Sequence, residues 1–288
     1  MYELVQLGPG SYYIQSPAKI GVWAMDPQNV VLIDSGNDKE AGRKVRQILD
    51  QQSWRLTAIV NTHSNADHIG GNKYLQAQTG CKIFAPGAET AFTRHPLLEP
   101  AFLYGGFPPQ ALRHKFLMAQ ESDAEYFTHP DFPEALTVLP LPGHFFDMAG
   151  FRTPDDTVFL ADCLAGEATL AKYGVPFIFD VQAYLDTLAM VETLEAKIFV
   201  PAHADATDNI APLARLNREK TLETGKVILA LCQTPVNFET VLRGVFTRYG
   251  LAMSMEQYAL VGSTVRSFLS WLLDKGELNA VFENNMLL

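Results

Sequence analysis

The chain has few cysteines and no long hydrophobic run. Its three cysteines, Cys81, Cys163 and Cys232, are far apart and form no CxxC pair, so the sequence gives no disulfide framework and fits a reducing compartment. No stretch of the sequence reaches the roughly 18 apolar residues of a membrane span. The first residues, MYELVQLGPGSYY, lack a basic segment followed by an apolar one. We therefore expect a cytoplasmic protein with no membrane partner.

The chain is also short of positive charge. It carries 22 Lys and Arg against 32 Asp and Glu, which gives a net charge of −10. A nucleic-acid partner is not expected, because binding to phosphates needs clustered cations. A small-molecule substrate fits this composition better. The length of 288 residues, 48% of them hydrophobic, is enough for one large domain and a smaller one.

Strand-like runs separated by Gly, Pro and Asp dominate the first half of the chain. The pattern predicts strands in LVQLG, SYYIQ, KIGVWAM and NVVLIDSG, and then strands that alternate with helices. The later strands are expected in LTAIVNTH, CKIFAP, ALTVLPLPGH, TVFLADCL and KIFVPAH, and the helices over 39–52, in GGNKYLQAQTG and over 181–197. Antiparallel strands followed by this alternation indicate a fold that mixes α and β structure.

Two segments fall outside this alternation. Residues 89–133 are rich in aromatics, Pro and Gly, which predicts an insertion or lid. Its Phe102, Tyr104, Phe107 and Phe116 would line an apolar substrate pocket or, equally, pack the insertion onto the core or a partner subunit. After residue 208, three helices are expected over 216–231, 238–249 and 255–274, followed by a short β-ribbon. We interpret 209–288 as a small winged-helix-like domain that packs against the domain at 1–208 or against a second subunit of a homodimer.

Histidines and carboxylates gather just beyond the strand-like runs. His63, Asp67 and His68 lie close together in NTHSNADHIGGN. The other three are His144 in LPLPGHFFD, Asp162 in FLAD and His203 in VPAH. Loops at strand ends commonly present functional groups, so these six side chains could meet at one edge of a sheet. Imidazole and carboxylate ligands suit Zn²⁺, and Fe²⁺ or Mn²⁺ by the same chemistry.

In this order and spacing, THSNADHIGGN, PGHFFD, FLAD and VPAH resemble the motifs of the metallo-β-lactamase fold superfamily, which includes the glyoxalase II type thioesterases. The resemblance covers residues 1–208 and implies a four-layer αββα sandwich with a two-metal cleft along the sheet edges. It implies six metal ligands: His63, Asp67, His68, His144, Asp162 and His203. The end of the chain is similar to the winged-helix-like module attached to some relatives.

The chain departs from the family pattern at Asn65, which stands where the second histidine of the first motif is expected. The resemblance assigns the first metal to His63, position 65 and His144, the second to Asp67, His68 and His203, and a bridging role to Asp162. A neutral amide oxygen is a poorer donor to Zn²⁺ than imidazole. We therefore expect one tightly held ion at the second site or an unequal pair, with complete loss of activity as a further alternative.

Four residues beside or within the ligand set have separate expected roles. Asp67 would orient the attacking water or accept its proton. Gly70 and Gly71 precede a helix, so their N–H groups could bind an anionic group of the substrate, although close packing of helix on strand explains them equally well. Asp34, in VLIDSG, is expected to brace the metal loop by hydrogen bonds without binding metal.

These observations favour a metal-dependent hydrolase that acts on a small thioester, lactone or related acyl compound through activated water. One alternative is a non-catalytic or regulatory binding protein with a structural or vestigial metal site. A phosphodiesterase or nuclease of the same fold is a second alternative, which the acidic composition disfavours.

Overall fold

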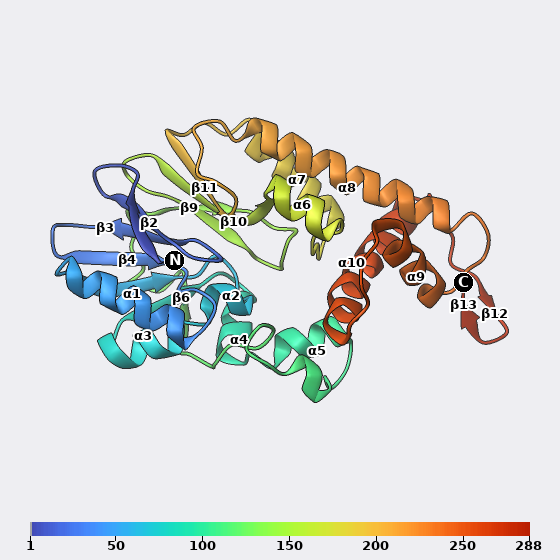
Figure 1. Ribbon diagram of the computed structural model, residues 1–288, viewed down its shortest axis with the longest axis horizontal. Coiled ribbons are helices and arrows are strands. Elements are labelled where there is room, and N and C mark those ends of the chain that lie inside the picture. The colour runs from blue at the N-terminus through green and yellow to red at the C-terminus, as the bar shows by residue number, and fades with distance from the viewer. Residues whose placement is uncertain (1) are drawn as a thin grey trace.

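The protein is described by a computed structural model that covers residues 2–288 (Figure 1). Within those residues, one sheet has seven strands in chain order. The strands are β1 (Glu3–Gln6), β2 (Ser11–Gln15), β3 (Ile20–Ala24), β4 (Asn29–Ile33), β5 (Arg55–Val60), β6 (Lys82–Ala85) and β7 (Ala124–Tyr126). Strands β1 to β4 pair antiparallel through short turns. Strands β4 to β7 pair parallel, which requires the longer helical connections between them.

The second sheet carries the later part of the chain. Among the described residues it has four strands in the order β11-β10-β9-β8. These are β8 (Thr137–Pro140), β9 (Ala149–Arg152), β10 (Thr157–Ala165) and β11 (Ile198–His203). The connection from β10 to β11 contains α6 (Glu167–Tyr173) and α7 (Val181–Glu192), which allows those two strands to run parallel. Neither β9 nor α6 was predicted from the sequence.

Apolar side chains fill the space between the layers. Between the two sheets, Val60 and Phe84 of the first sheet share a buried cluster with Phe151 and Phe159 of the second. On the outer face of the first sheet lie α1 (Lys39–Gln51) and α3 (Asn72–Thr79), whose packed side chains include Val45, Leu49 and Leu75. Helix α7 covers the outer face of the second sheet with Leu188 and Val191. The predicted four-layer αββα arrangement is therefore confirmed.

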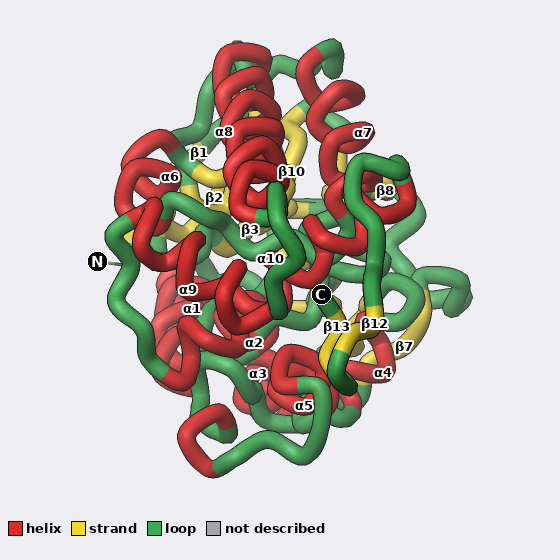
Figure 2. Tube along the Cα trace, turned by 90° about the vertical axis from the view of Figure 1, so that its right-hand side faces the viewer, coloured by secondary structure: helices red, strands yellow, loops and turns green. Residues whose placement is uncertain are grey.

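The C-terminal region is helical, as expected. It contains α8 (Ala211–Leu231), α9 (Phe238–Tyr249), α10 (Met255–Asp274) and a ribbon of β12 (Phe282–Glu283) and β13 (Met286–Leu287). Helix α8 lies along α7, and α9 and α10 gather at the far end of the molecule (Figures 1 and 2). The predicted bounds of α9 and α10 are confirmed, and side chains cap the start of each helix: Asn237 accepts from Thr240 N and Ser254 from Gln257 N.

Two predicted boundaries differ from the structure. Helix α8 begins at Ala211, five residues before the predicted start, since a proline is tolerated in the first turn of a helix. Helix α7 ends at Glu192 rather than at Lys197, because the chain must turn there to enter β11. The N–H of Thr193 bonds back to the carbonyls of Met190 and Val191 and closes the helix.

The predicted insertion at 89–133 is partly regular structure. It forms α4 (Glu89–Arg94), α5 (Leu98–Tyr104), the 3₁₀ turn η1 (Gln110–Leu112) and the edge strand β7 of the first sheet. Leu103, Leu112 and Leu117 of this segment share an apolar cluster with Ala259 of α10. The segment is therefore both a connection within the sheet and a contact to the C-terminal helices. No described helix has both the length and the apolar character needed to cross a bilayer.

Candidate metal centre

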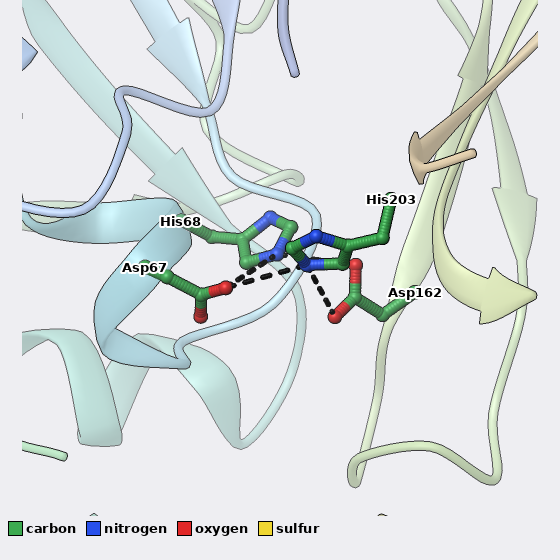
Figure 3. A group of neighbouring side chains, drawn as sticks. All are labelled: Asp67, His68, Asp162 and His203. Carbon is green, nitrogen blue, oxygen red and sulfur yellow. Dashed lines mark ion pairs between the residues drawn. The ribbon is translucent and has the colours of Figure 1, made fainter. Parts of the chain in front are cut away.

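The six side chains that the sequence singled out as ligands meet at the edge where the loops of both sheets face each other. His63 follows β5, while Asp67 and His68 lie on the short helix α2 (Ala66–Ile69). His144 lies in the turn after β8, Asp162 on β10, and His203 at the end of β11. Figure 3 shows Asp67 and His68 pointing from α2 toward Asp162 and His203 on the opposite sheet. The polypeptide thus brings four separate segments to one place.

An irregularity in β10 aims Asp162 at this edge. The register between β10 and β11 shifts on both sides of Ala161, and Ala161 has a φ of 49°, in the left-handed region. A bulge of this kind bends a strand and redirects its next side chain. Asp162 consequently points toward the loops of the other sheet, although the residues around it are part of a buried strand.

Hydrogen bonds hold the four histidine rings from behind. In each ring Nδ1 has a protein partner, which leaves Nε2 directed toward the shared space. The partners are Asp34 Oδ2 for His68 (2.7 Å), Pro17 O for His203 (3.0 Å), Phe177 O for His144 (3.1 Å) and Thr62 Oγ1 for His63 (3.0 Å). Because carbonyl and carboxylate oxygens only accept, Nδ1 must be the protonated nitrogen in the first three rings. Nε2 is then the ring nitrogen left to bind a cation, once it carries no proton.

Four of the side chains form one compact group. Ligand atoms of Asp67, His68, Asp162 and His203 all lie within 4.8 Å of one another. His203 Nε2 is 3.3 Å from both Asp67 Oδ2 and Asp162 Oδ2, and His68 Nε2 is 3.1 Å from Asp162 Oδ1. Two imidazoles and two carboxylates at such distances form a ligand set suited to one metal ion.

A second group shares Asp162 with the first. Ligand atoms of His63, His144 and Asp162 also lie within 4.8 Å of one another, and His144 Nε2 is 3.7 Å from Asp162 Oδ2. Asn65 is close to this group, with its Oδ1 3.2 Å from His144 Nε2. Its Nδ2 donates to Glu99 Oε1 at 2.8 Å, so the amide oxygen is the end that faces the histidines.

The polar atoms at the centre are better placed to bind a cation than to form hydrogen bonds with one another. Among the described residues, His63 Nε2, His68 Nε2 and Asp162 Oδ1 are buried without a hydrogen-bond partner. Buried polar atoms are rarely left unpaired, so such a cluster of lone-pair donors indicates a bound ion. The ligand set thus fits the metal that the resemblance implies.

The electrostatics of the centre show which side chains would release a proton on binding a metal and which already have the form of a ligand. In the absence of a cation, the Asp162 carboxylate raises the pKa of His203 to about 10, so this ring carries a proton that a metal ion would displace. Although burial opposes it, the attraction of His68 and the hydrogen bond from His203 hold the pKa of Asp67 at about 2. Burial lowers the pKa values of His63 and His144, so these rings stay neutral at pH 7. Neutral imidazoles and ionised carboxylates are the forms that bind metals.

Asp34 holds the metal loop as the sequence suggested. Its Oδ1 accepts from Thr62 N at 2.8 Å, and its Oδ2 accepts from Thr62 Oγ1 at 2.7 Å and from His68 Nδ1. Thr62 Oγ1 donates to Asp34, so it accepts from His63 Nδ1. Asp34 itself is buried, with a φ of 63°, and belongs to neither ligand group. One carboxylate therefore orients two histidine rings.

Gly70 and Gly71 have a packing explanation in the structure. A Cβ on Gly70 would lie 2.3 Å from the backbone carbon of Asn37, and one on Gly71 would lie 2.3 Å from the carbonyl oxygen of Ser35. The N–H of Gly71 donates to Gly36 O. Of the two explanations offered for these glycines, the structure supports close packing against the loop after β4.

Of the aromatic residues expected to line a substrate pocket, Tyr104 and Phe107 lie away from the centre. Tyr104 and Phe107 are 44% and 73% exposed, and neither borders the hollow beside the centre. Phe107 stacks on the guanidinium of Arg113 instead. Phe102 of the same segment does approach the site, since its ring packs against Phe145 and Phe146, next to His144. Tyr104 instead lines a separate hollow between α5 and α10, so a role of these two residues in substrate binding stays a prediction.

Two buried carboxylates near the centre escaped the sequence analysis. Glu99 holds Asn65, and Glu89 accepts from the N–H and hydroxyl of Ser64 and from the N–H of Asp147. Both residues lie in the insertion, 25 or more positions from the loop they support. In the sequence, these two residues stand out only as acidic side chains within an apolar, aromatic segment.

Comparisons with known proteins agree with this geometry. A family model described as the metallo-beta-lactamase superfamily matches residues 22–203, more than half of the chain. A hydroxyacylglutathione hydrolase from Methylobacillus flagellatus is 26% identical over 148 residues, 49% of this chain and 48% of that protein. The beta-lactamase-like protein 2 homolog of Drosophila melanogaster is 24% identical over 185 residues, 62% of this chain and 56% of that protein.

A hydroxyacylglutathione hydrolase from Methylococcus capsulatus is 44% identical, but over 46 residues, which are 16% of this chain and 18% of that protein. The chain therefore matches from less than a fifth to just over half the length of these relatives.

Solved structures extend the likeness to the C-terminal helices. A metallo-beta-lactamase family protein from Thermus thermophilus superposes with a TM-score of 0.71 at 15% identity, covering 100% of this chain and 97% of that one. A beta-lactamase domain protein from Burkholderia ambifaria gives a TM-score of 0.71 at 15% identity, covering 99% and 92%. The fold is shared along the whole chain, and the matched segment 22–203 runs from the first sheet to His203. By this match the chain belongs to the metallo-beta-lactamase superfamily.

Proposed function

We propose that the protein is a metal-dependent hydrolase of a small ester-like compound, such as a thioester, a lactone or a related acyl derivative. The observation that carries the proposal is the convergence of two histidine and carboxylate groups on Asp162, with buried Nε2 and Oδ1 atoms that have no partner among the described residues. We propose Zn²⁺ as the ion, since imidazole and carboxylate ligands in such groups suit it. When bound, the metal would supply a Lewis acid and lower the pKa of a water molecule.

The residues around the centre have different proposed roles. Asp67 is half-buried, so its carboxylate can be reached from solvent while it stays 3.3 Å from His203 Nε2. This position allows Asp67 to orient a water molecule or to take its proton. Asp162 belongs to both groups and would be shared between two ions, while Asp34 keeps the rings of His63 and His68 in place.

The two ligand groups are unequal. The group of Asp67, His68, Asp162 and His203 consists of imidazoles and carboxylates, whereas the His63 and His144 group has the amide of Asn65 as its neighbour. We propose that the first of these holds its ion more tightly, because an amide oxygen is a weaker donor to Zn²⁺ than imidazole.

Metal analysis and a substrate panel test this proposal together. The purified protein should contain at least one equivalent of Zn²⁺ and hydrolyse chromogenic thioesters or lactones in preference to phosphodiesters and cephalosporins. Removal of the metal should abolish turnover, and re-addition should restore it. Asp67→Ala should lower kcat/KM by about 100-fold or more.

The exposed Asp186→Ala serves as the matched control and should leave the rate unchanged, since Asp186 lies on α7 outside the centre. A metal-loaded protein that turns over no ester on the panel would refute the proposal.

A further inference from the structure

A hollow of about 230 Å³ opens directly beside the metal centre. His144, Asp162 and His203 form one end of it, so a group that enters the hollow lies next to the ligand set. Its volume is below the range of about 300–1,000 Å³ that is usual for sites of drug-sized ligands. The hollow is therefore suited to a small part of a substrate rather than to all of it.

The other walls are mainly apolar and come from distant parts of the chain, although Thr169, Tyr184, Gln257 and Thr264 also line the hollow. The apolar residues include Leu164 at the end of β10, Leu170 of α6, Val175 and Phe177 of the following loop, and Leu260 and Val261 of α10. The C-terminal region thus forms one wall of the hollow, and the candidate metal centre forms one end of it.

A chain of contacts fixes that wall relative to the centre. The N–H of Ile178 donates to Thr264 Oγ1 of α10 at 3.3 Å, which ties the loop after α6 to the C-terminal helices. One residue earlier in the same loop, the carbonyl of Phe177 accepts from His144 Nδ1. The position of α10 and the orientation of His144 therefore depend on the same short loop.

The hollow has few groups that could bind an anion. None of the described residues that line it is lysine or arginine, and its one carboxylate, Asp162, belongs to the metal centre. Lys172 bonds the hydroxyl of the lining residue Tyr173, but both side chains are exposed, so this ammonium lies at the surface. A carboxylate held at the end of the hollow away from His203 and the metal centre would lose its hydration without gaining a cation, which is costly.

We propose that this hollow binds the uncharged, apolar acyl group of the substrate, with Leu260 and Val261 of α10 setting the acyl length that fits. The proposal rests on the hydrolase function proposed above and specifies its substrate class: short neutral acyl esters or thioesters.

The experiment compares neutral acyl thioesters of increasing chain length with analogues that carry a terminal carboxylate, using the full-length, metal-loaded protein. We expect kcat/KM to rise about fourfold for each methylene that the hollow can accept, since a buried CH₂ contributes about 0.8 kcal/mol. The value should fall once the acyl group is too long. The carboxylated analogues should react at least about tenfold more slowly than neutral ones of equal length.

Two variants assign the effect to α10. Leu260→Trp should shift the preferred acyl group to shorter chains, and Val261→Ala should shift it to longer chains. Leu273→Trp is the matched control, because Leu273 lies on the same helix but borders a separate hollow in the C-terminal region. It should leave the length profile unchanged.

Calorimetric binding of the free carboxylic acids, the products of hydrolysis, gives a readout independent of turnover. Their affinity for the metal-loaded protein should follow the same order of chain length. If no ester reacts but this order is found, the hydrolase function fails and the acyl site stands. If esters react with no dependence on acyl length, if the carboxylated analogues react faster, or if Leu260→Trp leaves the profile unchanged, the acyl site is refuted.

Discussion

The side-chain amide of Asn65 is held between two groups of opposite character. Its Nδ2 donates to the buried carboxylate of Glu99, and its Oδ1 faces His144 Nε2 at 3.2 Å. The orientation of the amide is therefore set by Glu99, which lies on α5. This arrangement presents an oxygen to the group of His63 and His144, where a neutral oxygen binds Zn²⁺ less strongly than imidazole does.

Replacing this amide by imidazole should strengthen the weaker site. We expect Asn65→His to raise the Zn²⁺ content toward two ions per chain and to tighten the weaker ion at least about tenfold, because an imidazole nitrogen replaces an amide oxygen. Asn65→Ala should lower the content instead. Metal analysis after dialysis against a defined Zn²⁺ buffer and titration with a competing chelator measure both effects. An unchanged stoichiometry in Asn65→His would contradict the assignment of this group as a metal site.

Glu89 is, after Glu99, a second buried carboxylate near the centre. Burial raises its pKa to about 7, although Ser64 and the N–H of Asp147 donate hydrogen bonds to it. Since the folded pKa lies above the ordinary value of 4.5, the folded protein favours the protonated form. The resulting contribution to stability is complete below pH 4.5 and is lost as the pH rises through 7.

A comparison of the wild type with Glu89→Gln should show this loss. We expect the difference in free energy of unfolding, wild type minus variant, to fall by up to about 3 kcal/mol between pH 4.5 and pH 8. Urea denaturation across this range measures this difference. The hydrogen bonds that the glutamine variant loses change its free energy of unfolding by the same amount at every pH, so they leave the pH dependence of the difference unchanged. A difference that is constant with pH would show that Glu89 titrates normally.

At the scale of elements, the junction between β8 and α7 leaves no room for a side chain at Gly143. Gly143 has a φ of 119°, and a Cβ there would lie 2.3 Å from the backbone nitrogen of Tyr184. Its carbonyl accepts from the N–H groups of Phe179 and Asp180, where α7 begins. The turn that carries His144 is therefore packed directly onto the helix that covers the second sheet.

Gly143→Ala should be far more damaging than the same change at Gly80. We expect it to cost more than about 3 kcal/mol in free energy of unfolding, because both the backbone angle and the contact with α7 oppose a Cβ. Gly80 also has a positive φ, 69°, but a Cβ there meets nothing within 4 Å. Gly80→Ala should therefore cost about 1 kcal/mol. Chemical denaturation measures both, and equal losses would contradict this account of the junction.

At the scale of the whole molecule, one apolar core joins the second sheet to the C-terminal helices. Leu160 of β10 and Leu188 of α7 belong to the same buried cluster as Val245 of α9 and Phe268 of α10. Because this core is continuous, we expect the sheet and the helices to unfold together rather than as separate units. The domain boundary at residue 208 stays a prediction, and on this expectation it would not separate two units that unfold independently.

Phe268→Ala tests this continuity. Phe268 is fully buried, so its truncation should lower the free energy of unfolding by about 3–5 kcal/mol. Hydrogen exchange followed by mass spectrometry should show that amides of β10 and of α9 lose protection by the same amount. Loss of protection confined to α9 and α10 would mean that the C-terminal region unfolds by itself.

Much of this protein could be predicted from local patterns. The strands that read as apolar, β-branched runs and the helices with capping residues were found close to their true bounds. Strand β9 and helix α6 were missed, because AGFR and EATLAKY are short and carry weak signals. The metal motifs were visible because the four histidines and Asp67 lie at or just after strand ends, where loops present functional groups. Asp162 instead lies within β10, where the bulge at Ala161 aims it at the same edge.

The sequence by itself determined the ligand types, the elements that carry them and the departure at Asn65, since these depend on residue identity and local spacing. The tertiary structure decided which side chains support them: Glu99 behind Asn65, Pro17 behind His203, and α10 beside the centre. These contacts join residues 34 to 186 positions apart or lie on separate elements, so no local pattern encodes them. They arise when the two sheets and the C-terminal helices pack around a common core, and burial then fixes the partner of each polar atom.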